Sequence, residues 1–248
     1  MAQSLVMTYR MWQRNRDMFL TTWKASVGGI LLEPLFLLVA VGFGLGTLVD
    51  VDLVRGLSYG QFIAPGIIAG YTMFHASGEC LWGTYIRMER QHTFDGILAT
   101  PMSVEELVMG EILWGATKGV VSAVMVLAVA SAFGLINSPL AVLIVPLAFL
   151  AGLMFASIGI SYTSVAPSIS VLENFYTLFL TPMFFFGGAF YPVENLPDAI
   201  QPVLWVLPLT PVVRLARDLA LGEVGLGSLA ALGLVLLYTL IMVPVGVF

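Results

Sequence analysis

The stretch LAVLIVPLAFLAGLMFASIGISYTSV, residues 140–165, contains no charged side chain. About 20 mainly apolar residues are enough to cross the hydrocarbon core of a membrane as a helix. A strand of a membrane barrel would instead alternate apolar and polar residues, and this stretch is continuously apolar. The stretch therefore predicts a spanning helix, because a helix satisfies its own backbone hydrogen bonds inside lipid.

The composition of the whole chain agrees with this prediction. Of the 248 residues, 59% are hydrophobic and only 10% are charged, whereas a soluble domain carries about 25% charged residues. A single cysteine, Cys80, excludes an intramolecular disulfide. We therefore expect an integral membrane protein and no nucleic-acid partner.

We expect an all-α fold in one domain, residues 1–248, with six membrane-spanning helices. The predicted spans are residues 27–49, 62–84, 107–136, 140–165, 171–191 and 226–248. Lys and Arg concentrate in cytoplasmic loops. With the N-terminus inside, the predicted cytoplasmic set is Arg10, Arg14, Arg16, Lys24, Arg87 and Arg90, and the predicted external set is Arg55, Arg214 and Arg217. This asymmetry, with six spans, places both termini in the cytoplasm.

Residues 4–24 predict an amphipathic helix ahead of the first span. One side of a helical wheel carries Leu5, Tyr9, Trp12, Phe19 and Trp23, and the other carries Arg10, Arg14, Asp17 and Lys24, with only Arg16 misplaced. A basic helix with Trp on its apolar side is expected to lie in the headgroup plane, bound to membrane lipids. Its role is either to anchor the first span or to take part in coupling.

The predicted cytoplasmic loop, residues 86–102, contains a short helix. Phe94, Ile97 and Leu98 follow helical spacing and form a small apolar face, and Pro101 ends the helix. Ser103 and Glu106 then form the pattern of a capping box at the start of the next helix. The apolar face either binds a partner protein or packs against the chain's own helices.

The predicted external loop, residues 192–225, is apolar but broken by prolines at 192, 197, 202, 208 and 211. The pieces between these prolines are too short to span. We expect half-helices that enter the outer leaflet without crossing it.

Ionisable residues inside predicted spans are costly and rarely face lipid. They are Glu33, Glu79 and Lys118, with Glu111 and Glu173 near the cytoplasmic boundary. His75 lies one helical turn before Glu79. The two residues form either a proton relay or a buried pair that fixes helix packing.

Enzyme motifs are missing from the sequence. A phosphate-binding loop of the form G-x-x-x-x-G-K-[ST] is excluded because neither Lys24 nor Lys118 follows a glycine. Two histidines and one cysteine are too few for a typical metal cluster. We expect no catalytic residue, metal or cofactor in this chain.

The fifth predicted span is rich in aromatic residues. Tyr176, Phe179, Met183 and Phe186 follow helical spacing along one expected face. Such a stripe contacts acyl chains and the flat faces of sugars. It forms either part of a transport path or a packing contact within the protomer.

Several of these segments together resemble the type-2 ABC export permeases, and in particular their NodJ-like nodulation-factor subgroup. The segments are TFDGILATPMSVEE at 93–106, GEILWGATK at 110–118, FIAPGI at 62–67, FFGGAFYP at 185–192 and LP at 196–197.

The resemblance implies the ABC-2 (type V exporter) fold, a homodimer of permeases, and a separate ATPase subunit that holds ATP and Mg²⁺. It implies that residues 4–24 are the family's interface helix and that the loop around residues 93–102 is its coupling helix. The implied ATPase contacts are Thr93, Phe94, Asp95, Ile97, Leu98, Pro101 and Met102. The implied location is the inner membrane of a bacterium.

The leading hypothesis is therefore the permease subunit of an ATP-driven exporter of an amphiphile, such as a lipo-oligosaccharide, glycan, lipid or drug. A proton-coupled secondary carrier using His75, Glu79 and Lys118 is the alternative, although no internal repeat is present. A membrane enzyme acting on lipid-linked substrates would need clustered catalytic side chains, which the loops lack. Fold and family do not determine the cargo.

Overall fold

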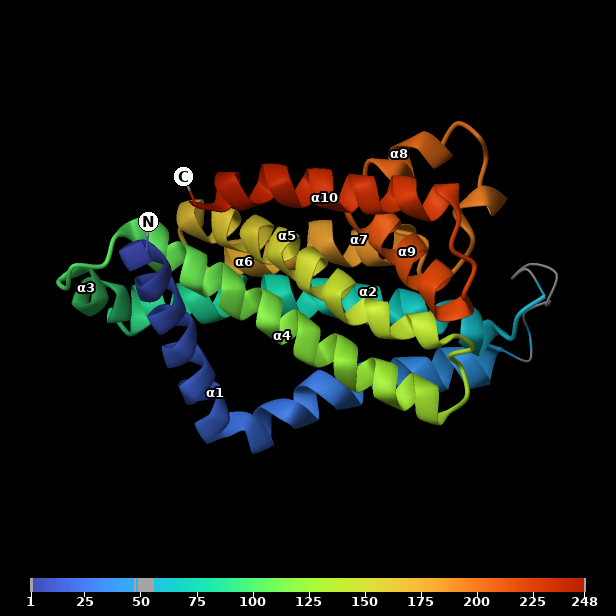
Figure 1. Ribbon diagram of the computed structural model, residues 1–248, viewed down its shortest axis with the longest axis horizontal. Coiled ribbons are helices and arrows are strands. Elements are labelled where there is room, and N and C mark those ends of the chain that lie inside the picture. The colour runs from blue at the N-terminus through green and yellow to red at the C-terminus, as the bar shows by residue number, and fades with distance from the viewer. Residues whose placement is uncertain (1, 47, 49–55, 248) are drawn as a thin grey trace.

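The computed structural model describes residues 2–46, 48 and 56–247, and every regular element in these residues is a helix (Figure 1). The first half contains α1 (Ala2–Leu37), the π-helix η1 (Leu38–Leu45), α2 (Tyr59–Gly78), the π-helices η3 (Glu79–Gly83) and η4 (Ile86–Arg90), α3 (Thr93–Leu98) and α4 (Val104–Ala132). The second half contains η5 (Pro139–Leu143), α5 (Ile144–Val165), α6 (Ile169–Phe175), the π-helix η6 (Tyr176–Leu180), α7 (Thr181–Phe186), η7 (Val193–Asn195), α8 (Gln201–Trp205), α9 (Leu209–Leu221) and α10 (Leu226–Val247).

Five of the described helical segments are long and apolar enough to cross a membrane. They are Ser26–Leu45, Val104–Ala132, Pro139–Val165, Ile169–Phe186 and Leu226–Val247. The predicted span 62–84 is helical as α2 and η3, but it is not among the five. Polar residues such as His75, Ser77 and Glu79 interrupt its apolar character. Six spans therefore stay a prediction.

Three positions used in the sequence analysis lie outside the described residues. They are Val49 and Phe248, at the ends of two predicted spans, and Arg55 of the predicted external set. The fifth predicted span also ends earlier than residue 191, because α7 stops at Phe186 and a turn begins at Gly187.

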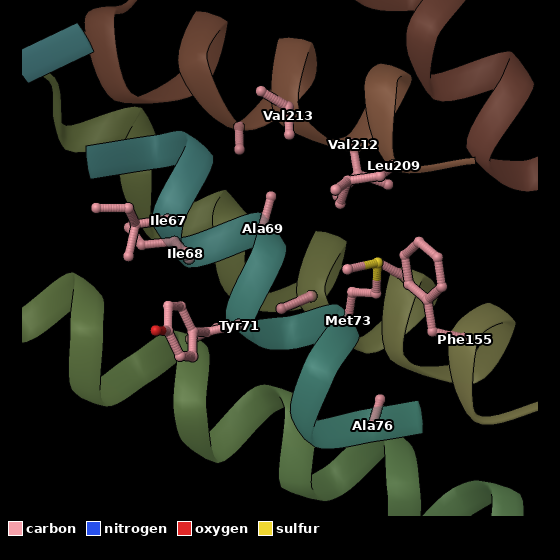
Figure 2. Close-up of a cluster of buried hydrophobic side chains, with 14 of the residues drawn as sticks. Ile67, Ile68, Ala69, Tyr71, Met73, Ala76, Phe155, Leu209, Val212 and Val213 are labelled. Atoms are coloured by element: carbon pink, nitrogen blue, oxygen red, sulfur yellow. The ribbon is translucent and has the colours of Figure 1, made fainter. Parts of the chain in front are cut away.

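α2 lies at the centre of the bundle and packs against α4, α5 and α9. Figure 2 shows Met73 of α2 beside Phe155 of α5, with Leu209, Val212 and Val213 of α9 nearby. Small residues permit these close approaches. A Cβ on Gly152 of α5 would lie 2.8 Å from the Cα of Ala116 in α4. Packing through small residues is the usual way in which helices associate in lipid, where burial of apolar surface gives no driving force.

α1 continues without interruption from the predicted amphipathic segment into the first predicted span, and it bends sharply between the two (Figure 1). Thr8, Met11 and Asn15 are buried on the side of α1 that faces α4. Leu5 and Tyr9 of the predicted apolar side are exposed. The rest of that side contacts α4 through Trp12 and Phe19, so only part of it is open to lipid.

The two ends of the bundle differ. α3 and both termini lie at one end, and α8, α9 and the start of α10 lie at the other (Figure 1). Within the predicted external loop, α9 begins after Pro208 and ends at Gly222, whose positive φ of 80° is one that glycine adopts without strain. α9 packs beside α2 and α10 instead of lying free.

Candidate functional site

Four charged side chains form a cluster where η3, η4 and α4 meet; we call Glu79, Arg87, Glu111 and Lys118 the charge cluster. Glu79 accepts from Arg87 Nη1 and from Lys118 Nζ, each at 2.9 Å. Arg87 Nη2 also pairs with the carboxylate of Glu111. Two cations and two anions thus alternate along one chain of contacts, and their formal charges cancel.

Glu111 is the most deeply placed member, with no exposed surface. Besides Arg87, its carboxylate accepts from Thr84 Oγ1 at 2.8 Å and from Asn15 Nδ2 at 3.0 Å. A buried charge is tolerated only when it is paired and its remaining hydrogen-bonding capacity is used. Since Asn15 belongs to α1, this carboxylate of α4 joins the amphipathic segment to Thr84 and to Arg87 of η4.

The charge cluster shifts the pKa values of two arginines, Arg87 and Arg14. Burial alone would lower the pKa of Arg87, but the adjacent Glu111 and Glu79 carboxylates outweigh burial and raise it. Burial and the nearby Arg87 guanidinium lower the pKa of Arg14. Arg87 is therefore held firmly in its charged form, as a bridging cation between two carboxylates must be.

The expected pairing of His75 with Glu79 is not formed, because Glu79 pairs with Arg87 and Lys118 instead. Within the described residues, His75 Nε2 is buried and has no hydrogen-bond partner. Lys118 also lies 5.2 Å from the ring centroid of Phe19 in α1, a cation–π contact. The intramembrane charges thus hold three helices together.

A hollow of about 330 Å³ adjoins the charge cluster; we call it the membrane cavity. Its lining residues are Glu33, Tyr71, Phe74, His75, Gly78, Glu79, Trp82, Gly83, Lys118 and Tyr176. A second hollow of about 260 Å³ lies under α1 and shares Glu79, Gly83 and Lys118 with the first. The two hollows therefore meet at the Glu79–Lys118 ion pair.

The loop 86–102 forms η4 and α3, and Ser103 with Glu106 closes a complete capping box at the start of α4. Phe94 and Leu98 line an apolar groove of about 280 Å³ together with residues of α4 and α5. Leu98 is still 40% exposed, and Asp95 is exposed beside it. The apolar face is thus shared between the chain's own helices and solvent.

Other predicted ATPase contacts surround α3. Thr93, Ile97 and Met102 are half-buried, and Pro101 is exposed. His92, just before α3, has a positive φ of 50°, which turns the chain sharply out of η4. α3 therefore sits on a defined turn at the tip of the bundle (Figure 1).

The prediction of one continuous stripe on the fifth span is wrong for Met183. Met183 is buried, with 2% exposure, whereas Phe179 and Phe186 are 44% and 55% exposed. The reason is the π-helix η6, whose wider turns shift the register between Tyr176 and Met183. Tyr176 faces the membrane cavity and Phe179 stacks on Phe175. The four residues therefore lie in different surroundings and do not form one face.

Sequence reasoning missed the contributions of Arg87, Thr84 and Asn15. Arg87 follows Glu79 by eight residues, about two helical turns, which could have indicated a shared face. Asn15 gave no comparable signal. No group of His, Cys, Asp or Glu that could hold a metal ion occurs in residues 2–46, 48 and 56–247.

The sequence profile of the family described as ABC-2 type transporter matches residues 3–221. The chain belongs to this family. It is 35% identical to "Nodulation protein J" of Sinorhizobium fredii over 216 residues, covering 87% of this chain and 82% of that protein. It is 29% identical to "Nodulation protein J" of Azorhizobium caulinodans over 243 residues, covering 98% and 95%. It is 22% identical to "Inner membrane transport permease YadH" of Escherichia coli over 219 residues, covering 88% and 82%.

Membership of the ABC-2 family agrees with the apolar spanning helices, and it makes the chain a membrane transport protein of the permease kind. The match to the ABC-2 profile includes the amphipathic part of α1, α3 and the whole charge cluster. These features therefore belong to the transport domain itself.

Proposed function

We propose that this chain is the permease subunit of an exporter that moves an amphiphile out across a bacterial inner membrane. A separate ATPase subunit binds ATP and Mg²⁺ and drives the movement. The observation that carries the proposal is the ABC-2 family match over most of the chain, joined to an exposed helix, α3, at one tip of the bundle.

α3 is the proposed docking element for the ATPase. Leu98 is 40% exposed beside a groove that its own helices do not fill. Burying a Phe or Leu side chain stabilises a contact by about 1.5–3 kcal/mol. η4 comes directly before α3 in the chain and carries Arg87 of the charge cluster. A movement of α3 would therefore displace Arg87, whose contacts connect it to α1 and α4.

The proposed orientation has six spans and both termini in the cytoplasm. In its support, both termini lie at the end of the bundle that carries α3, while Arg214 and Arg217 lie in α9 at the other end (Figure 1). The amphipathic part of α1 then lies in the cytoplasmic headgroup layer, in contact with membrane lipids.

Two copies of the chain are proposed to form the transport path between them. α6, η6 and α7 leave large apolar side chains uncovered, with Leu178 76% and Phe186 55% exposed. A second copy would cover such residues, and an amphiphile would slide along them because no single contact is strong.

The docking claim is tested by co-purification with the ATPase. The tagged permease carrying Phe94→Asp and Leu98→Asp is co-expressed with the ATPase encoded nearest to it in the genome. The charged pair should abolish co-purification while the permease still elutes as a monodisperse species. The matched control is Val224→Asp, an exposed position at the opposite end of the bundle, which should retain the ATPase. Retention of the ATPase by the double variant would exclude α3 as the dock.

A further inference from the structure

We propose that the membrane cavity binds the ammonium group of an organic cation, with the Glu33 carboxylate as its counter-ion and the aromatic rings of the lining as its walls. The proposal rests on the exporter function and assigns the cargo to the cationic amphiphiles. Neither the ABC-2 match nor the names of the relatives indicate this class.

Glu33 of α1 is the residue on which the proposal depends, because a carboxylate within an apolar span is costly and normally has a partner. It lies in the candidate span Ser26–Leu45 and is exposed. The Tyr71 hydroxyl is close enough to interact with its carboxylate, but a neutral hydroxyl does not cancel the charge. Among the ion pairs of the residues that the structure describes, none includes Glu33. A cation is therefore the partner that this carboxylate lacks.

The other charges on the lining are compensated. Lys118 lies 2.9 Å from Glu79, and both belong to the charge cluster, whose two cations and two anions cancel. His75 Nε2 is buried and has no hydrogen-bond partner within the described residues. An imidazolium in that setting would be an unpaired buried cation, which is costly, so His75 is uncharged. Glu33 therefore makes the cavity negative overall.

The free carboxylate and the lysine act on different parts of the lining. Glu33 interacts electrostatically with the hydroxyls of Tyr71 and Tyr176. Lys118 interacts with His75 instead. A cation bound between Glu33 and the two tyrosines is therefore nearer to the free carboxylate than to the lysine ammonium.

The wall around Tyr71 and Tyr176 is aromatic. The ring of Tyr176 lies 5.1 Å from that of Phe74 and 4.9 Å from that of Trp82, and the rings of Tyr71 and Phe74 are 5.8 Å apart, all measured between centroids. Ring faces attract cations within about 6 Å, and quaternary ammonium ligands are commonly held in cages of such rings. Several rings and a free carboxylate around one hollow therefore match an ammonium group, whereas Glu33 would repel a phosphate.

Size and access fit the same ligand. The cavity, at about 330 Å³, lies at the lower end of the volumes of small-molecule sites, about 300–1,000 Å³. Because Glu33 is exposed within a span, a cation can reach it without separation of the packed helices. The hydrocarbon tail of a cationic amphiphile can then stay in the membrane while its head occupies the cavity.

Equilibrium binding to the permease–ATPase complex in nanodiscs of phosphatidylcholine, a lipid without net charge, tests the assignment. The radiolabelled probes share one dodecyl chain and differ in the head: dodecyltrimethylammonium, dodecyl maltoside and dodecyl phosphate, each far below its micellar concentration. Binding to nanodiscs without protein is subtracted. We expect dodecyltrimethylammonium to bind most tightly, because only its head carries the charge that Glu33 lacks.

Glu33→Gln should weaken binding of dodecyltrimethylammonium at least about tenfold, because a carboxylate–ammonium contact at about 4 Å contributes more than that factor near a protein surface. Glu223→Gln removes the same formal charge from the exposed loop between α9 and α10 and should leave the affinity unchanged. Tyr176→Leu removes one ring and should weaken binding about threefold or more, whereas Tyr176→Phe keeps the ring and should retain it.

Tighter binding of the maltoside or phosphate probe would overturn the assignment. Unchanged ammonium affinity in Glu33→Gln would overturn it too, as would unchanged affinity in Tyr176→Leu if the Glu33 variant does not fold. Binding needs no ATP. Absence of the ammonium site with ATP-driven transport intact would therefore refute this inference alone. Ammonium binding that Glu33→Gln removes, in a protein whose transport does not require ATP, would keep the site and refute the exporter function.

Discussion

The ammonium of Lys118 in α4 lies 2.9 Å from the carboxylate of Glu79 in η3. The same ammonium faces the ring of Phe19 in α1. One lysine therefore holds the first, second and third long helical segments of the chain in contact. This arrangement favours a structural role for the intramembrane charges over a proton relay. In a relay, a group that gains or loses a proton would have to separate from its ion-pair partner.

Arg87→Leu should destabilise the protein strongly. The change leaves the fully buried Glu111 carboxylate without its cation, and such a loss typically costs about 3–5 kcal/mol. We expect a lower yield of folded protein and a markedly lower temperature of unfolding in detergent. Arg16→Ala is the control, because the Arg16–Asp17 pair is exposed and should be worth at most about 1 kcal/mol. Equal unfolding temperatures for the two variants would contradict the assigned role of Arg87.

Gly110→Ala should loosen the contact between α1 and α4. A Cβ at this position would lie 2.5 Å from Cβ of Met11, so one helix must move. Overpacking of this kind costs about 1–3 kcal/mol. The measurement is limited proteolysis of the amphipathic segment, which should become faster.

Gly96→Ala is the matched control for that change. Gly96 lies in α3, and a Cβ there would meet nothing within 4 Å. Alanine in a helix is favoured over glycine by roughly 0.5–1 kcal/mol, so this variant should be as stable as the parent or slightly more so. Faster proteolysis in Gly96→Ala but not in Gly110→Ala would show that the α1–α4 packing is wrongly assigned.

Phe179 and Met183 should respond differently to truncation. Met183→Ala empties a buried position, which typically costs about 2–5 kcal/mol and should reduce the amount of folded protein. Phe179→Ala removes a ring that is 44% exposed, so expression should stay near normal while transport or substrate-stimulated ATP hydrolysis changes. Normal transport in Phe179→Ala would remove this residue from the path.

Single cysteines at 179 and 186 should form disulfide-linked dimers across the proposed path in membranes. The native Cys80 is buried and gives little background. Leu240→Cys on α10 is the control, because Leu240 is 73% exposed but lies on a helix not proposed to meet the second copy. Dimers formed through 240 but not through 179 or 186 would place the interface elsewhere.

The apolar helices were predictable because continuous apolar stretches are read directly from the sequence. The helix starting at Val104 was predictable too, since Ser103 and Glu106 carry a local capping pattern that needs no tertiary contact. The centre of the bundle was harder to predict. α2 and η3 are packed against other helices, so His75 and Glu79 can lie inside the bundle.

The finer geometry of the site depends on contacts that no local pattern encodes. Glu111 pairs with Arg87 and Asn15, which are distant in the sequence, so only the packed helices bring them together. The stripe over Tyr176–Phe186 was predicted from a regular helical period. The π-helix η6 breaks that period and rotates Met183 into the core.

Transport measured with ATP held constant and the proton gradient removed tests the central claim most directly. Inside-out vesicles containing the permease and its ATPase are given ATP and a fluorescent amphiphile from the outside, with and without an uncoupler. The account predicts that uptake requires ATP, is unchanged by the uncoupler, and is lost with the Phe94→Asp, Leu98→Asp variant. Uptake that continues without ATP and collapses on uncoupling would contradict it and identify a proton-coupled carrier instead.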